Sequence, residues 1–287
     1  MKALQFGKMT VERCIESERP SFFPEFIFPN YDQDAFEDEC HDWLKPYFVD
    51  AESGRLLMSL HRYMIKTPKH TIIVDTCVGN HKHRPDTNAW HMKDGPFLNK
   101  MITMGVAPES VDFVMCTHLH VDHVGWNTKL EDGRWVPTFP NAKYLFHEDE
   151  YAHWETEEMS EGAGNIRRAA YEDSVLPIVN DGRQLEASLY VESSPGHTPG
   201  HAFLRLECPN GGAVFTGDCM HHPVQVAYPE WNSRYCFDPE KSAATRQDIV
   251  ERCADTDTAV LAAHFAEPVA ARIISKGDRW KLDLNIN

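Results

Sequence analysis

The sequence lacks the features of a membrane protein and of a small disulfide-stabilised domain. No stretch approaches the ~18 consecutive apolar residues that a membrane-spanning helix needs. Eight cysteines occur, but none forms a Cys-x-x-Cys pair, and a chain of 287 residues can fold on its hydrophobic core alone. We expect reduced cysteines and no membrane association. The N-terminus leads into charged residues rather than an apolar signal core, which favours a cytoplasmic location.

Basic residues are also scarce. The chain has 28 Lys and Arg against 44 Asp and Glu, a formal net charge of -16. Proteins bind the phosphate backbone of nucleic acids through basic surfaces, so this balance disfavours DNA or RNA as a substrate. We expect a small-molecule substrate instead.

Two further absences limit the organisation and the chemistry. No low-complexity tract, charge block or Ser/Gly-rich linker marks a boundary, so we expect a single domain over residues 1–287, with 1–50 as an N-terminal extension. No Gly-x-Ser-x-Gly motif is present either, which weakens the case for a serine hydrolase.

One heptapeptide is more informative than the rest of the chain. Residues 117–123 read Thr-His-Leu-His-Val-Asp-His, which places His118, His120, Asp122 and His123 within six positions. Imidazole and carboxylate both suit borderline divalent ions such as zinc. The alternative is a histidine-rich surface loop, but a chance match at all four positions has a probability of roughly one in a hundred or less. We therefore predict a metal site.

Three more metal-type residues follow apolar segments with strand character. The run 189–191 precedes a Pro/Gly-rich turn that carries His197, the run 213–217 ends at Asp218, and the run 258–263 ends at His264. The heptapeptide itself follows the apolar run 111–116. Strands hold ligands rigidly while the loops after them leave a face open to substrate. The repeated pattern predicts a metal centre with more than one ion.

These motifs together resemble the metallo-β-lactamase-fold hydrolases over about residues 55 to 275. The resemblance implies an α/β fold, an αββα sandwich of two mixed β-sheets flanked by helices. It also implies that Asp75, which ends the strand 71–74, supports the site from behind the ligands. The implied ligands are His118, His120 and His197 for one ion, Asp122, His123 and His264 for the other, and Asp218 as the bridge between them.

The resemblance also implies the chemistry. Two ions held roughly 3.5–4 Å apart would share a bridging hydroxide as the nucleophile and polarise the carbonyl or phosphoryl oxygen under attack. Asp122 would act both as a ligand and as a proton shuttle. Zinc is the expected metal, with manganese, cobalt or iron also suited to the His/Asp set.

The residue three positions after the bridging aspartate indicates the branch of the family. The acyl-homoserine-lactone lactonases have a tyrosine there, whereas this chain has His221. The sequence is therefore more similar to methyl parathion hydrolase and related aryl-ester and lactone hydrolases. His221 would orient a substrate oxygen or donate a proton; the alternative is a histidine packed beneath the site.

We accordingly predict a lactonase or esterase that acts on an apolar or aromatic small molecule. A phosphotriesterase and a thioesterase resembling glyoxalase II remain alternatives on the same site. A mononuclear iron oxidoreductase and a non-catalytic binding module are further alternatives, disfavoured by the complete ligand set.

The remaining expectations concern the surroundings of the site. The long loop 79–97 opens on the metal face and is a candidate lid. Trp90, Phe97 and Trp126 form either an aromatic substrate wall or ordinary core. Cys116 and Cys219 flank the motifs and should be buried behind the site. Helices are expected at 96–104, 148–154 and from Pro239 to Cys253, the last with Asp238 as its N-cap.

The N-terminal extension carries an aromatic arm, residues 22–29, that periodicity does not explain. Such an arm would either join two subunits into a homodimer or cover the core of its own chain.

Overall fold

The computed structural model describes residues 2–156, 178–179, 184–186, 188–209 and 211–284. The chain divides into two compact units. We call Lys2–Glu16 with Leu60–Asn180 the N-terminal unit, and Ser17–Ser59 with Asp181–Asn287 the C-terminal unit. The prediction of a single domain stays a prediction.

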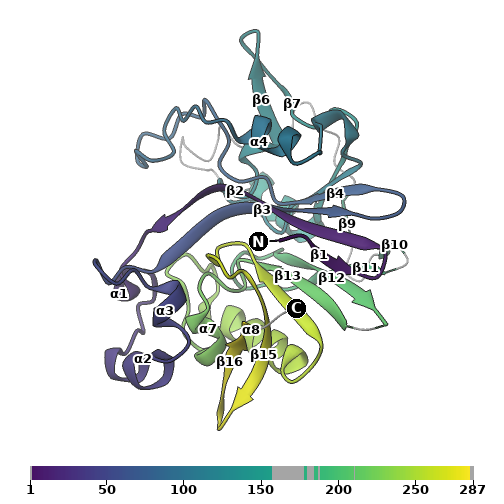
Figure 1. Ribbon diagram of the computed structural model, residues 1–287. Helices are drawn as coiled ribbons and strands as arrows, with labels where there is room; N and C mark the ends of the chain where they lie inside the picture. Colours follow the sequence, from purple (N-terminus) through teal and green to yellow (C-terminus); the bar gives the residue numbers. More distant parts are fainter. Residues whose placement is uncertain (1, 157–177, 180–183, 187, 210, 285–287) are drawn as a thin grey trace. The chain divides into compact units, whose positions relative to one another are not determined.

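The first sheet has the strand order β1-β2-β3-β4-β5-β8-β9. Figure 1 labels β1 to β4 and β9 of this sheet. Its centre is parallel: β4 pairs with β5, and β5 with β8. These strands are short apolar runs whose middle residues are buried on both sides, the pattern expected inside a parallel sheet. The strand bounds are Leu4–Phe6 (β1), Met9–Pro20 (β2), Leu57–Lys66 (β3), Thr71–Val74 (β4), Phe113–Met115 (β5), Lys143–His147 (β8) and Ile178–Val179 (β9).

Two helices of the N-terminal unit confirm the expectations from sequence. Helix α4 spans Phe97–Thr103 and α5 spans Glu148–Thr156. Both contribute to the core of this unit, α4 through Phe97 and α5 through residues packed against the same cluster. The unit also holds the hairpin β6 (Thr128–Glu131) and β7 (Arg134–Pro137) and the 3-10 turns η1 (Pro108–Ser110) and η2 (Gly125–Asn127).

The second sheet, in the C-terminal unit, has the order β10-β11-β12-β13-β14-β15-β16. Only β13 and β14 are parallel, because helix α8 (Pro239–Cys253) connects them as a crossover. The start of α8 is as predicted, with the side chain of Asp238 accepting a hydrogen bond from the Lys241 amide at 3.0 Å. The strand bounds are Gln184–Glu186 (β10), Leu189–Ser193 (β11), Ala202–Cys208 (β12), Gly211–Gly217 (β13), Thr258–Ala262 (β14), Ala270–Lys276 (β15) and Arg279–Asp283 (β16). Two mixed sheets with packed helices confirm the α/β class.

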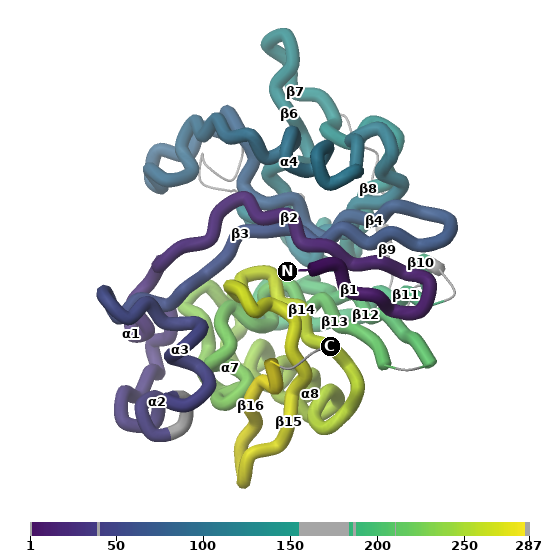
Figure 2. The backbone as a smooth tube through the Cα atoms, viewed as in Figure 1, coloured from purple at the N-terminus to yellow at the C-terminus, as the bar shows by residue number. Residues whose placement is uncertain are grey.

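The N-terminal arm packs on its own unit. Figure 2 follows it in purple through α1 (Pro24–Ile27), α2 (Gln33–Cys40) and α3 (Lys45–Phe48). Phe28 is fully buried, with its ring centroid 6.3 Å from that of Trp231. The arm therefore covers the core of its own chain, one of the two alternatives, while the homodimer stays a prediction.

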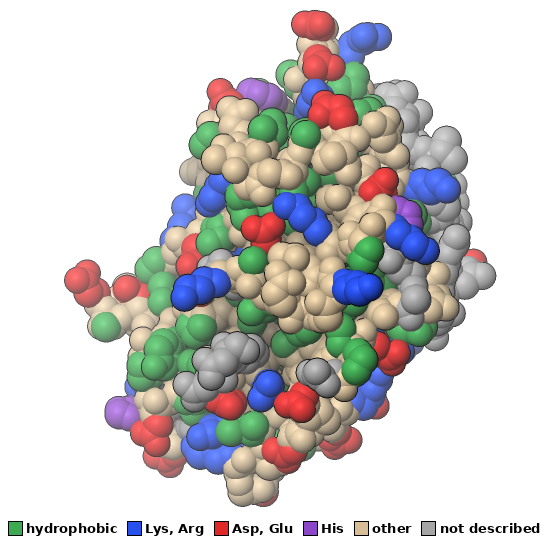
Figure 3. Space-filling model, turned by 45° about the vertical axis from the view of Figure 1, so that its right-hand side comes forward, with side chains coloured by type: hydrophobic (Ala, Val, Ile, Leu, Met, Phe, Trp, Pro, Cys, Tyr) green, Lys and Arg blue, Asp and Glu red, His purple; other side chains and the backbone are tan. Residues whose placement is uncertain are grey.

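Among the described residues, no helix is long and apolar enough to cross a membrane. On the face drawn in Figure 3, Lys and Arg side chains lie interspersed with Asp and Glu rather than gathered into one basic field. The expectation that the protein does not bind nucleic acids stays a prediction.

Candidate metal centre

The metal-type residues of the N-terminal unit sit where two parallel strands end. Val74 of β4 lies opposite Met115 of β5, and the amide of Asp75 continues the ladder by donating to the Met115 carbonyl at 2.8 Å. Parallel strands bring their carboxyl ends to the same edge of a sheet, where ligand sites occur. Asp75 and the heptapeptide 117–123 therefore meet at this edge.

The Asp75 carboxylate organises the start of the heptapeptide. Its Oδ1 accepts the backbone amide of Thr117 at 2.8 Å, and its Oδ2 accepts the Thr117 hydroxyl at 2.9 Å. Oδ2 also lies 2.9 Å from Nδ1 of His123. Asp75 is 3 % exposed and adopts φ 57°, a conformation uncommon outside glycine. The buried Asp75 carboxylate thus holds both ends of the motif.

These contacts orient the imidazole rings of His123 and His118. With Nδ1 of His123 on Asp75, its Nε2 faces Asp122, 3.9 Å from Oδ1. Nδ1 of His118 lies 3.1 Å from the Thr117 hydroxyl, and its Nε2 lies 3.0 Å from Nδ1 of His120. In both His118 and His123, one ring nitrogen is held by a protein group and the other faces a second candidate metal ligand. This is the usual arrangement of histidines that bind metals.

Helix α5 supports the same loop through a residue that sequence reasoning missed. Glu150 is fully buried, and its Oε1 accepts the amide of Leu119 at 2.9 Å and the indole N–H of Trp154 at 2.7 Å. The Trp154 ring in turn lies 5.6 Å from that of His120. Nothing in the local sequence around Glu150 signals this role, because the contact joins segments 31 residues apart.

The C-terminal unit gathers a second cluster around Asp218. This residue follows β13, and His264 follows its parallel neighbour β14 by two positions, so the two strand ends lie side by side. Oδ1 of Asp218 is 3.1 Å from Nε2 of His264. Oδ2 of Asp218 is 3.3 Å from Nε2 of His197 and 3.4 Å from Nε2 of His221. One carboxylate therefore faces three imidazoles, all of them buried.

The far nitrogens of these rings are also anchored. Nδ1 of His264 lies 3.0 Å from the carbonyl oxygen of Ser59, and Nδ1 of His197 lies 3.8 Å from the Cys236 sulfur. A nitrogen that donates to a carbonyl carries the proton, so Nε2 of His264 presents its lone pair toward Asp218. The ring is held in the tautomer that a metal ligand requires.

His201 supports Asp218 from behind, a role that its place in the turn 193–201 did not reveal. Its Nε2 accepts the backbone N–H of Asp218 at 3.1 Å, and its Nδ1 lies 2.7 Å from the hydroxyl of Ser194. The ring is fully buried. Because Nε2 accepts, Nδ1 carries the proton and donates to Ser194. The chain thus leaves β13 along a fixed path.

His221 belongs to the Asp218 cluster. The centroid of its ring lies 4.8 Å from the ring centroid of His197 and 5.8 Å from that of His264. Its amide donates to Oε1 of Gln225 at 2.6 Å, which fixes the backbone. A catalytic role for His221 stays a prediction.

Other predicted neighbours of the site are core residues. Cys116 and Cys219 are buried as expected, and burial raises the pKa of each thiol to about 12. Phe97 and Trp126 pack into the hydrophobic core of the N-terminal unit with rings 6.0 Å apart. Both rings therefore belong to the hydrophobic core, the second of the two alternatives, while a role in binding substrate stays a prediction.

The donor types in both units suit divalent ions. Buried or partly buried imidazole and carboxylate atoms approach one another at 3.0 to 3.9 Å. Such a set suits zinc and similar metals better than calcium or magnesium, which prefer oxygen ligands.

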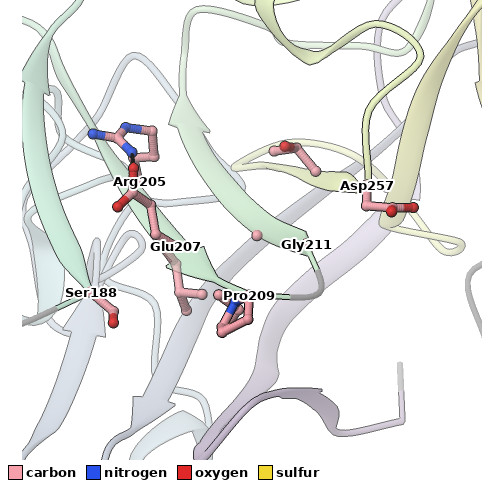
Figure 4. Close-up of a pocket in the computed structure, with 10 residues that line it drawn as sticks. Ser188, Arg205, Glu207, Pro209, Gly211 and Asp257 are labelled. Atoms are coloured by element: carbon pink, nitrogen blue, oxygen red, sulfur yellow. Dashed lines mark hydrogen bonds and ion pairs between the residues drawn. The ribbon is translucent and has the colours of Figure 1, made fainter.

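A separate hollow of about 550 Å³ lies at the hairpin end of β12 and β13 (Figure 4). It is lined by residues such as Ser188, Arg205 and Asp257. Asp218 follows the opposite end of the seven-residue strand β13, roughly 20 Å away at the usual rise per residue. This hollow is not part of the metal clusters.

Sequence comparisons find one matching family model and several curated relatives. The family model of the metallo-beta-lactamase superfamily matches residues 62–262. The N-acyl homoserine lactonase AttM of Azorhizobium caulinodans is 30% identical over 145 residues, 46% of this chain and 48% of that protein. AttM of Rhizobium radiobacter is 28% identical over 130 residues, 41% of this chain and 44% of that protein. The chain thus matches less than half the length of these relatives.

Two solved structures share the fold along nearly the whole chain. The hydrolase AbOPH has a TM-score of 0.78 at 24% identity, covering 98% of this chain and 95% of its own. AidC, a dizinc quorum-quenching lactonase solved with a product, has a TM-score of 0.80 at 16% identity, covering 98% and 96%. At such identities the likeness concerns the fold.

Proposed function

Because this chain belongs to the metallo-beta-lactamase superfamily, we propose that it is a dinuclear metal-dependent hydrolase that opens a lactone or cleaves an ester. The observation that supports this most directly is the Asp218 carboxylate, with imidazole nitrogens of three histidines within 3.4 Å. A carboxylate so surrounded is suited to bridge two ions. The motif of the N-terminal unit adds three imidazoles and a second carboxylate.

In this proposal the two clusters together supply the ligands. When bound, the two ions would provide a deprotonated water as the nucleophile and would polarise the carbonyl of the substrate. The ligands would be His118, His120 and His197 for one ion, Asp122, His123 and His264 for the other, and Asp218 for both.

The protein's own residues would do the rest. Asp122 is partly exposed, unlike His118 and His123, so its carboxylate is able to pass a proton between solvent and the leaving alcohol. His221 would donate a hydrogen bond to a substrate oxygen from the place that a tyrosine occupies in the acyl-homoserine-lactone lactonases. Asp75, Glu150 and His201 would keep the ligand-bearing loops in position.

The choice of substrate class rests on the relatives. The curated proteins that match are named N-acyl homoserine lactonases. His221 in place of the tyrosine favours a wider range of lactones and aryl esters, and we propose an apolar small molecule as the substrate. Zinc is the proposed metal because the imidazole-rich donor set suits it.

The test is a substrate panel with metal control. Purified protein is assayed on an N-acyl homoserine lactone, an aryl ester, an aryl phosphotriester and a thioester, before and after chelation. We expect lactone or ester turnover that chelation abolishes and that zinc or manganese restores. Metal analysis is expected to give two ions per chain.

The other outcomes separate the alternatives. Faster turnover of the phosphotriester or the thioester would move the assignment to that reaction. One iron per chain without hydrolysis would indicate the mononuclear oxidoreductase. Metal-independent turnover would refute the proposal altogether.

A further inference from the structure

The loop 79–97, a candidate lid by its length, is tied across its own base. The side-chain amide of Asn80 donates to the Gly95 carbonyl at 2.9 Å and accepts the Gly95 amide at 3.0 Å. The amide of His81 donates to the Lys93 carbonyl, and that of Met92 to the Lys82 carbonyl, both at 2.8 Å. A loop closed by this ladder cannot open from its base without breaking these bonds.

The same loop is fixed to the body of the N-terminal unit. Lys93 forms an ion pair with the buried Glu16 at 2.7 Å. Nζ of Lys82 donates to the Thr128 hydroxyl at 2.7 Å and lies 3.6 Å from the centroid of the Trp135 ring. These contacts favour a fixed wall over a moving lid.

Arg84 extends this wall to the metal motif. The residue is buried, at 7 % exposed, and its guanidinium reaches two backbone carbonyls. Nη1 donates to Val78 at 2.7 Å and Nη2 donates to Val121 at 3.1 Å. Val121 precedes Asp122, so Arg84 joins the start of the loop directly to the peptide that carries a predicted metal ligand.

We propose that Arg84 is a positioning residue for Asp122: its guanidinium fixes the Val121–Asp122 peptide and sets the carboxylate for the second ion. This inference rests on the proposed two-metal function. A fork of rigid N–H donors suits the task, because one side chain can bind two carbonyls at a fixed separation. A lysine offers only a flexible point charge.

The charges around Arg84 agree with this role. Burial lowers the pKa of Arg84, while the negative charges of Asp122 and Glu16 oppose that change. The guanidinium is thus a buried cation on which both carboxylates act electrostatically. Its own backbone is anchored too, since the Arg84 amide donates to Nδ1 of His91 at 3.0 Å.

The experiment compares metal binding in Arg84→Met, Arg84→Lys and Lys82→Met with the wild type. Lys82→Met is the matched control, because it removes a long basic side chain from the same loop without touching the motif. A competing chromophoric chelator measures two zinc dissociation constants, and thermal unfolding is followed in parallel. Loss of an outer contact to a metal ligand typically weakens metal binding or activity by about 10- to 100-fold.

We expect Arg84→Met to raise one dissociation constant by that factor and leave the other unchanged. Arg84→Lys should recover part of the loss, and Lys82→Met should affect unfolding without affecting either constant. Unchanged zinc binding in Arg84→Met would overturn the inference, as would an equal loss in Lys82→Met. A wild type that binds fewer than two ions would instead refute the proposed two-metal function.

Discussion

Nδ1 of His123 lies 2.9 Å from Oδ2 of Asp75, a residue 48 positions earlier in the chain. The contact joins the end of β4 to the end of the metal motif that follows β5. The Asp75 carboxylate accepts the proton on Nδ1 of His123, the common arrangement for a histidine whose other nitrogen binds a metal. It therefore leaves Nε2 as the atom for a metal.

Asp75→Asn should weaken metal binding without unfolding the protein. An amide keeps the size of the carboxylate but removes its charge and replaces one acceptor by a donor, so the ring of His123 loses its fixed tautomer. We expect a loss of about 10- to 100-fold in metal affinity or in kcat/KM. Chelator competition and steady-state kinetics measure both.

Asp112→Asn is the control for this substitution. The Asp112 carboxylate accepts the amide of Thr71 at 2.8 Å, at the opposite end of β4. The same chemical change there should leave metal affinity intact. Equal losses in the two variants would mean that Asp75 acts on the stability of β4 rather than on His123.

His201→Phe should displace Asp218 and cost stability. The substitution removes the acceptor of the Asp218 amide and the donor to Ser194, both buried. A buried polar group left without its partner costs about 1–3 kcal/mol. Urea unfolding measures the loss, and zinc affinity shows whether Asp218 has moved.

A double-mutant cycle with Ser194→Ala and His201→Gln tests whether the two side chains act together. The Asp218 N–H fixes the tautomer in which Nδ1 of His201 donates to Ser194, so the two side chains form one hydrogen-bond chain. Their effects on zinc affinity should therefore be less than additive. Strict additivity would contradict the linkage.

Several helices and strands could be predicted from the sequence, because each depends on residues that are close together in the chain. Asp238 and Pro239 predicted the start of helix α8. The apolar run before Asp218 predicted β13, and the apolar run before His264 predicted β14. The candidate ligands were readable for the same reason, since each follows a strand within a short motif. The positions of these residues in the chain carried the information.

The residues that support the candidate ligands could not be predicted, because their partners are distant in the sequence. Glu150 reaches Leu119 across 31 positions, and Arg84 reaches Val121 across 37. Nothing near either residue distinguishes it from a surface charge. Aromatic residues were ambiguous in the same way: Trp126 belongs to the core because its neighbours enclose it, which no periodicity in a loop reveals.

Gly125→Ala should disrupt the metal motif. A Cβ at Gly125 would lie 1.9 Å from the carbonyl oxygen of Val78, and one at Gly79 would lie 2.4 Å from the carbonyl oxygen of Gly125. Backbone cannot move aside as a flexible side chain can, so the loop after His123 must shift. We expect a loss of about 1–3 kcal/mol or more in unfolding free energy, together with weaker zinc binding.

Gly95→Ala is the matched substitution in the facing loop. A Cβ there would meet only ordinary contacts, the nearest at 3.8 Å. Stability should therefore change little. A larger loss in Gly95→Ala than in Gly125→Ala would show that backbone approach does not limit this region.

His222 should make the protein less stable in mild acid. Burial lowers the pKa of His222 from 6.5 to about 4. Its Nε2 lies 2.9 Å from the carbonyl oxygen of Phe48 at the end of α3, and its Nδ1 accepts the amide of Val224. The neutral ring, with its proton on Nε2, satisfies both contacts. A second proton on Nδ1 would face an N–H group.

The direction of the change in stability follows from the pKa of His222 in the unfolded chain, 6.5, and in the folded protein, about 4. Above about pH 6.5 the ring is neutral in both states, so its contribution to stability is complete. As the pH falls toward 4, the unfolded chain binds a proton that the folded chain does not, and stability is lost by up to about 3 kcal/mol. Urea unfolding of the wild type and of His222→Gln at pH 7 and pH 4.5 isolates this contribution, since other titrating groups are common to both proteins. The stability advantage of the wild type should shrink on acidification; an advantage that stays constant would mean that His222 is protonated in the folded protein.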